Sequence, residues 1–223
     1  MSAFWYGVGL QWKLDIRSKS LLITCYVVPL LFFAVMGGIF TALTPQAKNT
    51  IIQAMTVMGV SMGALIGLPP SLVEIYGGDV KKVYKANGVP LYLGLVSTSL
   101  SAFLHLMIMS AIIYVVAPVA FGAALPASLP AYIGALAAFV AASLAVGGAL
   151  GLAVKHQAKL TMLTQLFFLP SIMLSGIMFP AELLPRVLQG VGAAFPAAWG
   201  FKLMVDFSWA NAWPLAAAFA AAV

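Results

Sequence analysis

The chain has 223 residues, of which 63% are hydrophobic and only 7% carry a charge. Soluble domains have roughly 25% charged residues, so the composition excludes an ordinary water-soluble protein and indicates an integral membrane protein. The formal net charge of +6 is better explained by membrane topology and anionic lipid headgroups than by nucleic-acid binding, because the chain has no soluble domain to present a basic surface.

Residues 1–19 precede the first long apolar run. They lack the pattern of a cleavable signal, because their charges follow aromatic residues instead of preceding an apolar core. Aromatic rings sit at the headgroup level of a bilayer, and Lys and Arg side chains reach from there to water. We therefore expect an interfacial helix at residues 1–19. The single cysteine, Cys25, excludes an internal disulfide and is expected to be a small core residue.

Long apolar runs without alternation predict membrane-spanning helices and not a β-barrel. A bilayer leaves every backbone polar group to be satisfied by the chain itself, and a barrel would need short alternating segments. About 20 residues cross a hydrocarbon core of about 30 Å. Five runs of that length contain no Asp, Glu, Lys or Arg, and we predict a span in each: residues 20–43, 50–73, 91–117, 129–154 and 160–179.

A sixth span is expected near the end of the chain, but residues 212–223 alone are too short to cross a membrane. One possibility is a helix that begins near Ala197 and carries Lys202 and Asp206 as an i,i+4 pair. The other, which we favour, is a last helix that is truncated or only partly covered.

The basic residues predict the orientation of the chain. Eight of the eleven lie before the first span, between the second and third, or between the fourth and fifth. Basic residues gather on the cytosolic side of a membrane, so we expect a cytosolic N-terminus and, with six spans, a cytosolic C-terminus. The other three are Lys48, Arg186 and Lys202.

Glycines repeat at every fourth residue in two of the runs. Small residues at this spacing let two helix backbones approach closely, so these faces should pack against neighbouring helices, with packing inside the chain favoured over a subunit interface. The glycines are Gly59, Gly63 and Gly67 in the second run and Gly147 and Gly151 in the fourth.

Residues 59–63 also fit the G-x-S-x-G pattern, and His105 lies in the third run. An intramembrane serine hydrolase using Ser61 and His105 is therefore an alternative. That motif needs a strand-to-helix turn, however, and no Asp or Glu lies in the predicted spans to orient the histidine. We expect His105 to be packed, hydrogen-bonded or facing the membrane interface instead of relaying protons.

Residues 74–90 (EIYGGDVKKVYKANGVP) form the longest polar interruption of the chain. We expect an amphipathic docking helix here, ended by Gly88 and Pro90; a basic loop on lipid headgroups is the alternative. The chain has no G-x-x-x-x-G-K-[ST] phosphate loop, so any ATP must bind to a partner. In the expected helix, Tyr76, Val80, Val83 and Tyr84 share one side and Lys81, Lys82 and Lys85 another.

Two blocks of the sequence resemble the ABC type-2 permease family. Glu74, Gly78, the basic turn and the exit at residues 87–90 (NGVP) are similar to its coupling-helix segment. Residues 174–185 (LSGIMFPAELLP), followed by Pro196, are similar to the segment in which the fifth span ends and re-entrant extracellular helices begin. Asp79 departs from the family's usual Thr, and Gly88 from a frequent Pro.

The resemblance implies an all-α polytopic membrane protein with six transmembrane helices, formed by one permease domain over residues 1–223. Within it, the resemblance implies an interfacial helix at 1–19, a cytosolic coupling helix at 74–90 and an extracellular re-entrant segment at 179–200. It also implies a transport subunit and not an enzyme. This subunit would pair with a second permease copy, as homodimer or heterodimer, and with ABC ATP-binding subunits that hold ATP and magnesium, in a prokaryotic inner membrane.

The resemblance further implies export of a drug, lipid, peptide or lipid-linked glycan. Because the spans lack charged side chains, we expect a hydrophobic or amphipathic cargo. A passive channel or an assembly scaffold would fit the same hydropathy. The residues expected to contact the ATPase are Glu74, Gly78, Asp79, Lys81, Lys82 and Lys85, and those expected at an outer gate are Ser175, Gly176, Phe179, Pro180 and Pro185.

Overall fold

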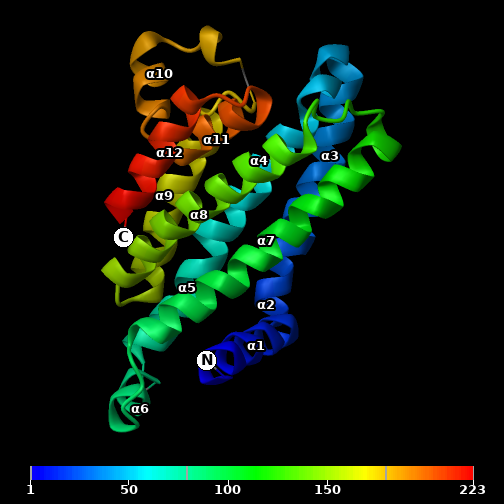
Figure 1. The fold of residues 1–223 in the computed structure, drawn as a ribbon. Helices are drawn as coiled ribbons and strands as arrows, with labels where there is room; N and C mark the ends of the chain where they lie inside the picture. Colours follow the sequence, from blue (N-terminus) through cyan, green and yellow to red (C-terminus); the bar gives the residue numbers. More distant parts are fainter. Residues whose placement is uncertain (1, 79, 179, 223) are drawn as a thin grey trace.

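The computed structural model describes residues 2–78, 80–178 and 180–222, and the regular structure of these residues is helical (Figure 1). The expected all-helical architecture is therefore confirmed for this part of the chain. Four helical segments in it are long and apolar enough to cross a membrane, and each overlaps one of the first four predicted runs. They are Ile23–Leu43, Ile51–Gly77, Tyr92–Phe121 and Leu129–Ala153.

The first two segments each contain a π-helical turn just before a proline. A proline has no N–H, so Pro29 and Pro69 cannot donate to the carbonyl four residues earlier, and a wider turn accommodates the missing bond. The two π-turns pack against each other. One segment follows α2 (Lys19–Leu22) and consists of η1 (Ile23–Val27) and α3 (Val28–Leu43); the other consists of α4 (Ile51–Met62), η3 (Gly63–Gly67) and α5 (Leu68–Gly77).

The third and fourth segments are the longest helices, α7 (Tyr92–Phe121) and α8 (Leu129–Ala153). The 30 residues of α7 extend over about 45 Å, more than the thickness of a hydrocarbon core. α7 ends where Gly122 adopts a left-handed conformation, with φ 62°. Ser128 caps the start of α8, and its hydroxyl accepts a hydrogen bond from the N–H of Ala131.

α4 lies at the centre of the bundle, and all of its residues are buried. It contacts α3, α7, α8 and α9. Gly59 lies against Met109 and Gly63 against Leu106, which are both on α7, and Gly67 lies against Cys25. The glycine face of the second segment thus packs within the chain, on α7 and η1.

α8 approaches the second segment through its own glycines. A Cβ atom on Gly147 would collide with the carbonyl oxygen of Ala64, and one on Gly151 would lie 3.0 Å from the Cα of Pro69. Close backbone approach of this kind is what small residues at four-residue spacing permit. The close approach at Gly147 and Gly151 holds α8 against η3 and α5.

The remaining apolar helices are shorter. α9 (Gln157–Met173) has 17 residues and α12 (Trp209–Ala222) has 14. A continuous last helix beginning near Ala197 with a Lys202–Asp206 pair is wrong, because α11 (Pro196–Val205) ends before Asp206, which is extended. The side-chain amide of Asn211 donates to the Asp206 carbonyl, and the Lys202 ammonium lies 4.8 Å from the centre of the Trp199 ring.

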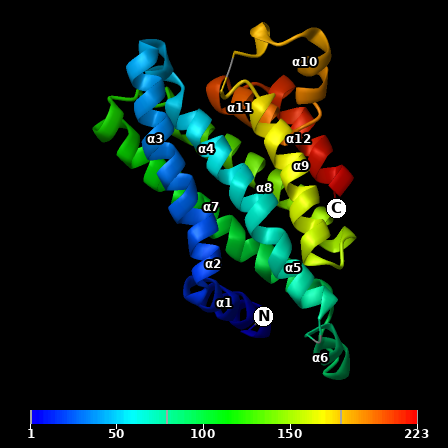
Figure 2. The same cartoon turned by 180° about the vertical axis from the view of Figure 1, so that it is seen from behind.

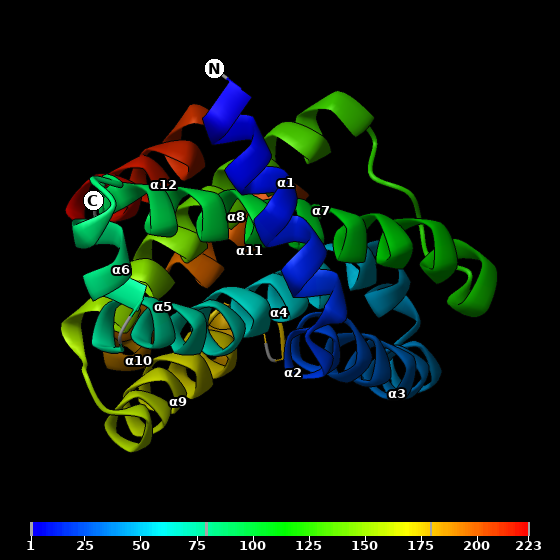
Figure 3. The same cartoon turned by 90° about the horizontal axis from the view of Figure 1, so that it is seen from below.

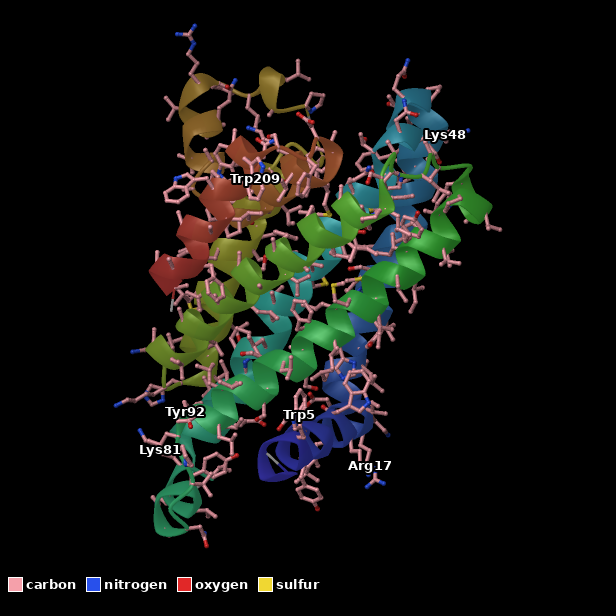
Figure 4. The ribbon with its side chains drawn as sticks, viewed as in Figure 1. Trp5, Arg17, Lys48, Lys81, Tyr92 and Trp209 are labelled. Atoms are coloured by element: carbon pink, nitrogen blue, oxygen red, sulfur yellow. The ribbon has the colours of Figure 1, made fainter. Side chains whose placement is uncertain are left out.

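Different helices lie at the two ends of the bundle. α1 (Ser2–Arg17) lies across one end, from which α6 (Val80–Ala86) projects (Figures 2 and 3). η2 (Pro45–Asn49), η4 (Ala181–Leu183), α10 (Arg186–Gly192) and α11 lie at the opposite end. Arg17 and Lys81 lie at one end, and Lys48 lies at the other (Figure 4). We call the first the α6 end and the second the α10 end.

Candidate functional site

α6 is a seven-residue helix between the ends of α5 and α7, and a glycine bounds it on each side. At Gly78 the backbone is extended, and an added Cβ would lie 2.8 Å from the carbonyl oxygen of Glu74. Gly88 has φ +65°, and beyond it the N–H of Val89 bonds back to the carbonyl of Tyr84 at 2.9 Å. This is the glycine-dependent end of a helix that the sequence predicted at Gly88.

The outward surface of α6 combines apolar and basic side chains. Val80 and Val83 are 40% and 56% exposed, and Lys81 and Lys82 are also exposed. Glu74 is exposed on the neighbouring end of α5. Asp79 lies outside the described residues, as does the side chain of Lys85. The described part of this surface suits either a protein partner or anionic headgroups.

Tyr76 does not belong to the docking helix, contrary to the helical spacing proposed from the sequence. It lies on α5, and the chain breaks at Gly78 before α6 begins. Its hydroxyl donates to the carbonyl of Leu91 at 2.5 Å and accepts from the N–H of Leu95 at 2.9 Å. Tyr76 therefore ties the end of α5 to the start of α7, so that α6 is held from both sides.

At the α10 end, the segment after α9 is shaped by a serine and a glycine. Buried Ser175 donates to the carbonyl of Ile172 at 2.8 Å and accepts from the N–H of Ile177 at 3.4 Å. Gly176 has φ +87°, which ends the helical path of α9. Pro180 and Pro185 immediately precede η4 and α10. Phe179 lies outside the described residues.

A largely apolar cavity of about 520 Å³ lies between α4, η3, α8, α9 and α12. Its lining residues include Ser61, Ser143 and Ser171, together with Phe167 and Phe195. Ser61 lies within α4, so the strand-to-helix turn required by the serine-hydrolase hypothesis is not there. His105 does not line this cavity. Ser61 and His105 therefore have different surroundings, since Ser61 lines this cavity and His105 does not.

A family model described as ABC-2 type transporter matches residues 2–207 of the chain. The chain belongs to this family. The resemblance seen in two blocks of the sequence is thereby confirmed, and the protein is a permease subunit of an ABC transporter. No curated protein and no solved structure was found to match it.

This ABC-2 permease also contains a buried polar contact between α1 and α7. Asp15 on α1 is buried and accepts hydrogen bonds from Gln11 at 2.8 Å and from the hydroxyl of Ser101 on α7 at 2.5 Å. One turn along α7, the His105 ring stacks on Trp12, with 4.1 Å between the ring centres. We call Trp12, Asp15, Ser101 and His105 the α1–α7 polar contact.

The α1–α7 polar contact was not predicted from the sequence, because a carboxylate partner for His105 was considered only within the predicted spans. The carboxylate comes instead from the interfacial helix. Two patterns pointed to it: Gln11 and Asp15 are spaced by four residues on α1, and Ser97, Ser101 and His105 by four on α7. Such spacing places side chains on one helix face. Of the alternatives expected for His105, packing and hydrogen bonding agree with its contacts to Trp12 and to Tyr26.

Proposed function

We propose that this permease is the membrane-spanning subunit of an ATP-driven exporter, and that separate ATP-binding subunits dock on α6. The family match supports an ABC transporter and partners of this kind. The observation that carries the proposal is the position of α6, which projects from the bundle between two spans, α5 and α7, that Tyr76 joins to each other (Figure 1). The proposed contacts are Glu74, Gly78, Asp79, Lys81, Lys82 and Lys85.

The proposed mechanism transmits force from α6 into the spans. A helix held between α5 and α7 moves both when a partner presses on it. The π-turns η1 and η3 lie side by side above that point, and π-turns are frequent sites of bending in helices. Closure of the ATP-binding subunits, with ATP and magnesium bound to them, would tilt the α6-end halves of the first two spans and switch access between the two sides of the membrane.

We further propose six spans, with α9 and α12 as the fifth and sixth, and assembly with a second permease copy. The α6 end would face the cytosol of a prokaryote, across its inner membrane, because Lys and Arg residues concentrate there. Residues 179–200 would form the re-entrant outer segment. Ser175, Gly176, Phe179, Pro180 and Pro185 would shape an outer gate above a path formed by the first, second and fifth spans.

The proposed cargo is hydrophobic or amphipathic. The four long segments contain one acidic residue, Glu74, and no lysine or arginine, and Glu74 is exposed at the α6 end. The cavity beside α4 is lined by three serines among mostly apolar residues. Small ions would find no charged lining in the described spans, whereas a lipid, a drug or another amphipathic molecule would be accommodated.

Co-purification in mild detergent tests the docking proposal. An ATP-binding subunit should remain bound to the tagged permease, with ATPase activity in the eluate, and should be lost when Lys81, Lys82 and Lys85 are all changed to Glu. The matched control changes Lys155 and Lys159 to Glu, because these lie in and just after the α8–α9 loop at the same end and outside α6. A permease that purifies alone under conditions that preserve membrane complexes would favour a channel or scaffold instead.

A further inference from the structure

The carboxylate of Asp15 is buried next to neutral groups. It is 5% exposed, and its hydrogen-bond partners among the described residues, Gln11 and Ser101, are both uncharged. Lys13 and Arg17, its basic neighbours on α1, are exposed. A carboxylate removed from water without a cationic partner carries a large desolvation cost, so this site favours anything that neutralises it.

The imidazole of His105 is buried beside the same contact. It is 1% exposed, its Nδ1 lies 2.7 Å from the hydroxyl of Tyr26, and its Nε2 has no hydrogen-bond partner among the described residues. Trp12 covers one face of the ring, with 11° between the ring planes. A buried ring nitrogen without a partner is uncommon in proteins and calls for a physical explanation.

The two groups lie on consecutive turns of one helix contact. Asp15 is three residues after Trp12 on α1, and His105 is four residues after Ser101 on α7. Because Ser101 bonds to Asp15 and Trp12 stacks on His105, the carboxylate and the imidazole share the same interface. We propose that Asp15 and His105 form a proton-binding pair that holds one exchangeable proton where α1 meets α7.

One proton would offset the first of these anomalies, the isolated negative charge. The deprotonated pair carries a buried negative charge, whereas the protonated pair, a carboxylate with an imidazolium, is neutral overall. The proton is taken up from the aqueous phase and returned to it, so no bond other than an O–H or N–H forms or breaks. Because the protonated pair avoids an isolated buried charge, proton binding stabilises the packing of α1 on α7.

The other elements packed on α7 bring few titratable groups to this place. η1 contributes Cys25 and Tyr26, while α3, α4 and η3 contain no titratable residue. Tyr76 of α5 bonds near the start of α7, and the Tyr132 ring of α8 lies against the Tyr114 ring near its other end. Glu74 of α5 is exposed at the α6 end. Asp15 is thus the buried carboxylate that the described residues place at the interface containing His105.

The test uses the fact that the chain has only two histidines, His105 and His156. In a His156→Asn chain labelled with ¹⁵N-histidine and held in lipid nanodiscs, the imidazole signals of His105 report its protonation directly. We expect reversible protonation of His105 within the pH range in which the chain stays folded. At a given pH, the ratio of imidazolium to imidazole should fall by about tenfold in Asp15→Asn.

Asp206→Asn is the matched control, because Asp206 is an exposed aspartate at the α10 end. The proposal is overturned if Asp15→Asn titrates like this control, or if His105 does not change protonation at all. If Asp15→Asn does not fold, ¹³C-aspartate labelling of the parent and of His105→Gln gives the same comparison from the carboxylate. Identical titration of Asp15 in those two chains would equally overturn it. Neither readout requires transport or an ATPase, so the outcome is independent of the proposed function.

Discussion

The hydroxyl of Tyr76 on α5 accepts a hydrogen bond at 2.9 Å from the backbone N–H of Leu95 on α7. It also donates to the carbonyl of Leu91. A single side chain thus joins the two helices between which α6 is held. In the proposed exporter, this bridge makes α5 and α7 respond together to a force on α6.

Tyr76→Phe should weaken that bridge. The change leaves the N–H of Leu95 and the carbonyl of Leu91 without this partner, which costs about 1–3 kcal/mol where the groups are buried. We expect a lower thermal unfolding temperature in detergent and less transport per ATP hydrolysed in the assembled complex. Tyr92→Phe is the control, because Tyr92 is 66% exposed at the start of the same helix. Equal behaviour of the two variants would argue against the bridge.

Gly147→Ala should destabilise the bundle, because its new methyl group would collide with the carbonyl oxygen of Ala64. Overpacking of this kind costs about 1–3 kcal/mol. Gly134→Ala is the matched control on the same helix, since a Cβ there meets no atom within 4 Å. Alanine is favoured over glycine in a helix by about 1 kcal/mol, so Gly134→Ala should be neutral or stabilising. Thermal unfolding of the two variants in the same detergent distinguishes these outcomes.

Gly147 and Gly151 show what could and what could not be predicted from the sequence. Four-residue spacing of Gly147 and Gly151 predicted a close helix contact, because spacing fixes which residues share a face. It could not identify the opposing atoms, which depend on how α8 crosses η3 and α5. For the same reason Tyr76 was assigned to the wrong helix. Its spacing fits Val80 and Val83, but the extended backbone at Gly78 separates them.

Charge patterns had a similar limit. Four of the five long runs without charges coincide with helices long enough to cross a membrane, since hydrocarbon excludes charge whatever the tertiary contacts are. The pairing of Asp15 with Ser101 was not predicted, because it depends on which face of α1 lies against α7. The break between α11 and α12 was likewise not visible, since an i,i+4 pair of Lys202 and Asp206 is compatible with an uninterrupted helix.

Gly78→Ala should disturb the start of α6. The added methyl would lie 2.8 Å from the carbonyl oxygen of Glu74, so the backbone before α6 must shift. We expect weaker retention of the ATP-binding subunit during co-purification, with normal folding of the bundle. Gly77→Ala serves for comparison, because its Cβ would make an ordinary contact, 3.6 Å from the carbonyl of Lys155. If both variants retain the partner equally, the position of α6 is not set by Gly78.

Cys25 gives a probe of the paired π-turns, because it is the only cysteine of the chain and lies in η1, where its sulfur faces Gly67 of η3. Its sulfur is the atom that a Cβ on Gly67 would meet, at 3.3 Å, and only 3% of the residue is exposed. A maleimide should therefore label the resting permease slowly. If η1 and η3 separate when access switches, ATP and magnesium added to the assembled complex should raise the labelling rate severalfold. The control is a Lys81→Cys, Cys25→Ala chain. Because Lys81 is already exposed, its labelling rate reports any change in the access of the reagent to the complex. A nucleotide-independent rate at Cys25 would mean that the first two spans move as one body, and would place the bending elsewhere.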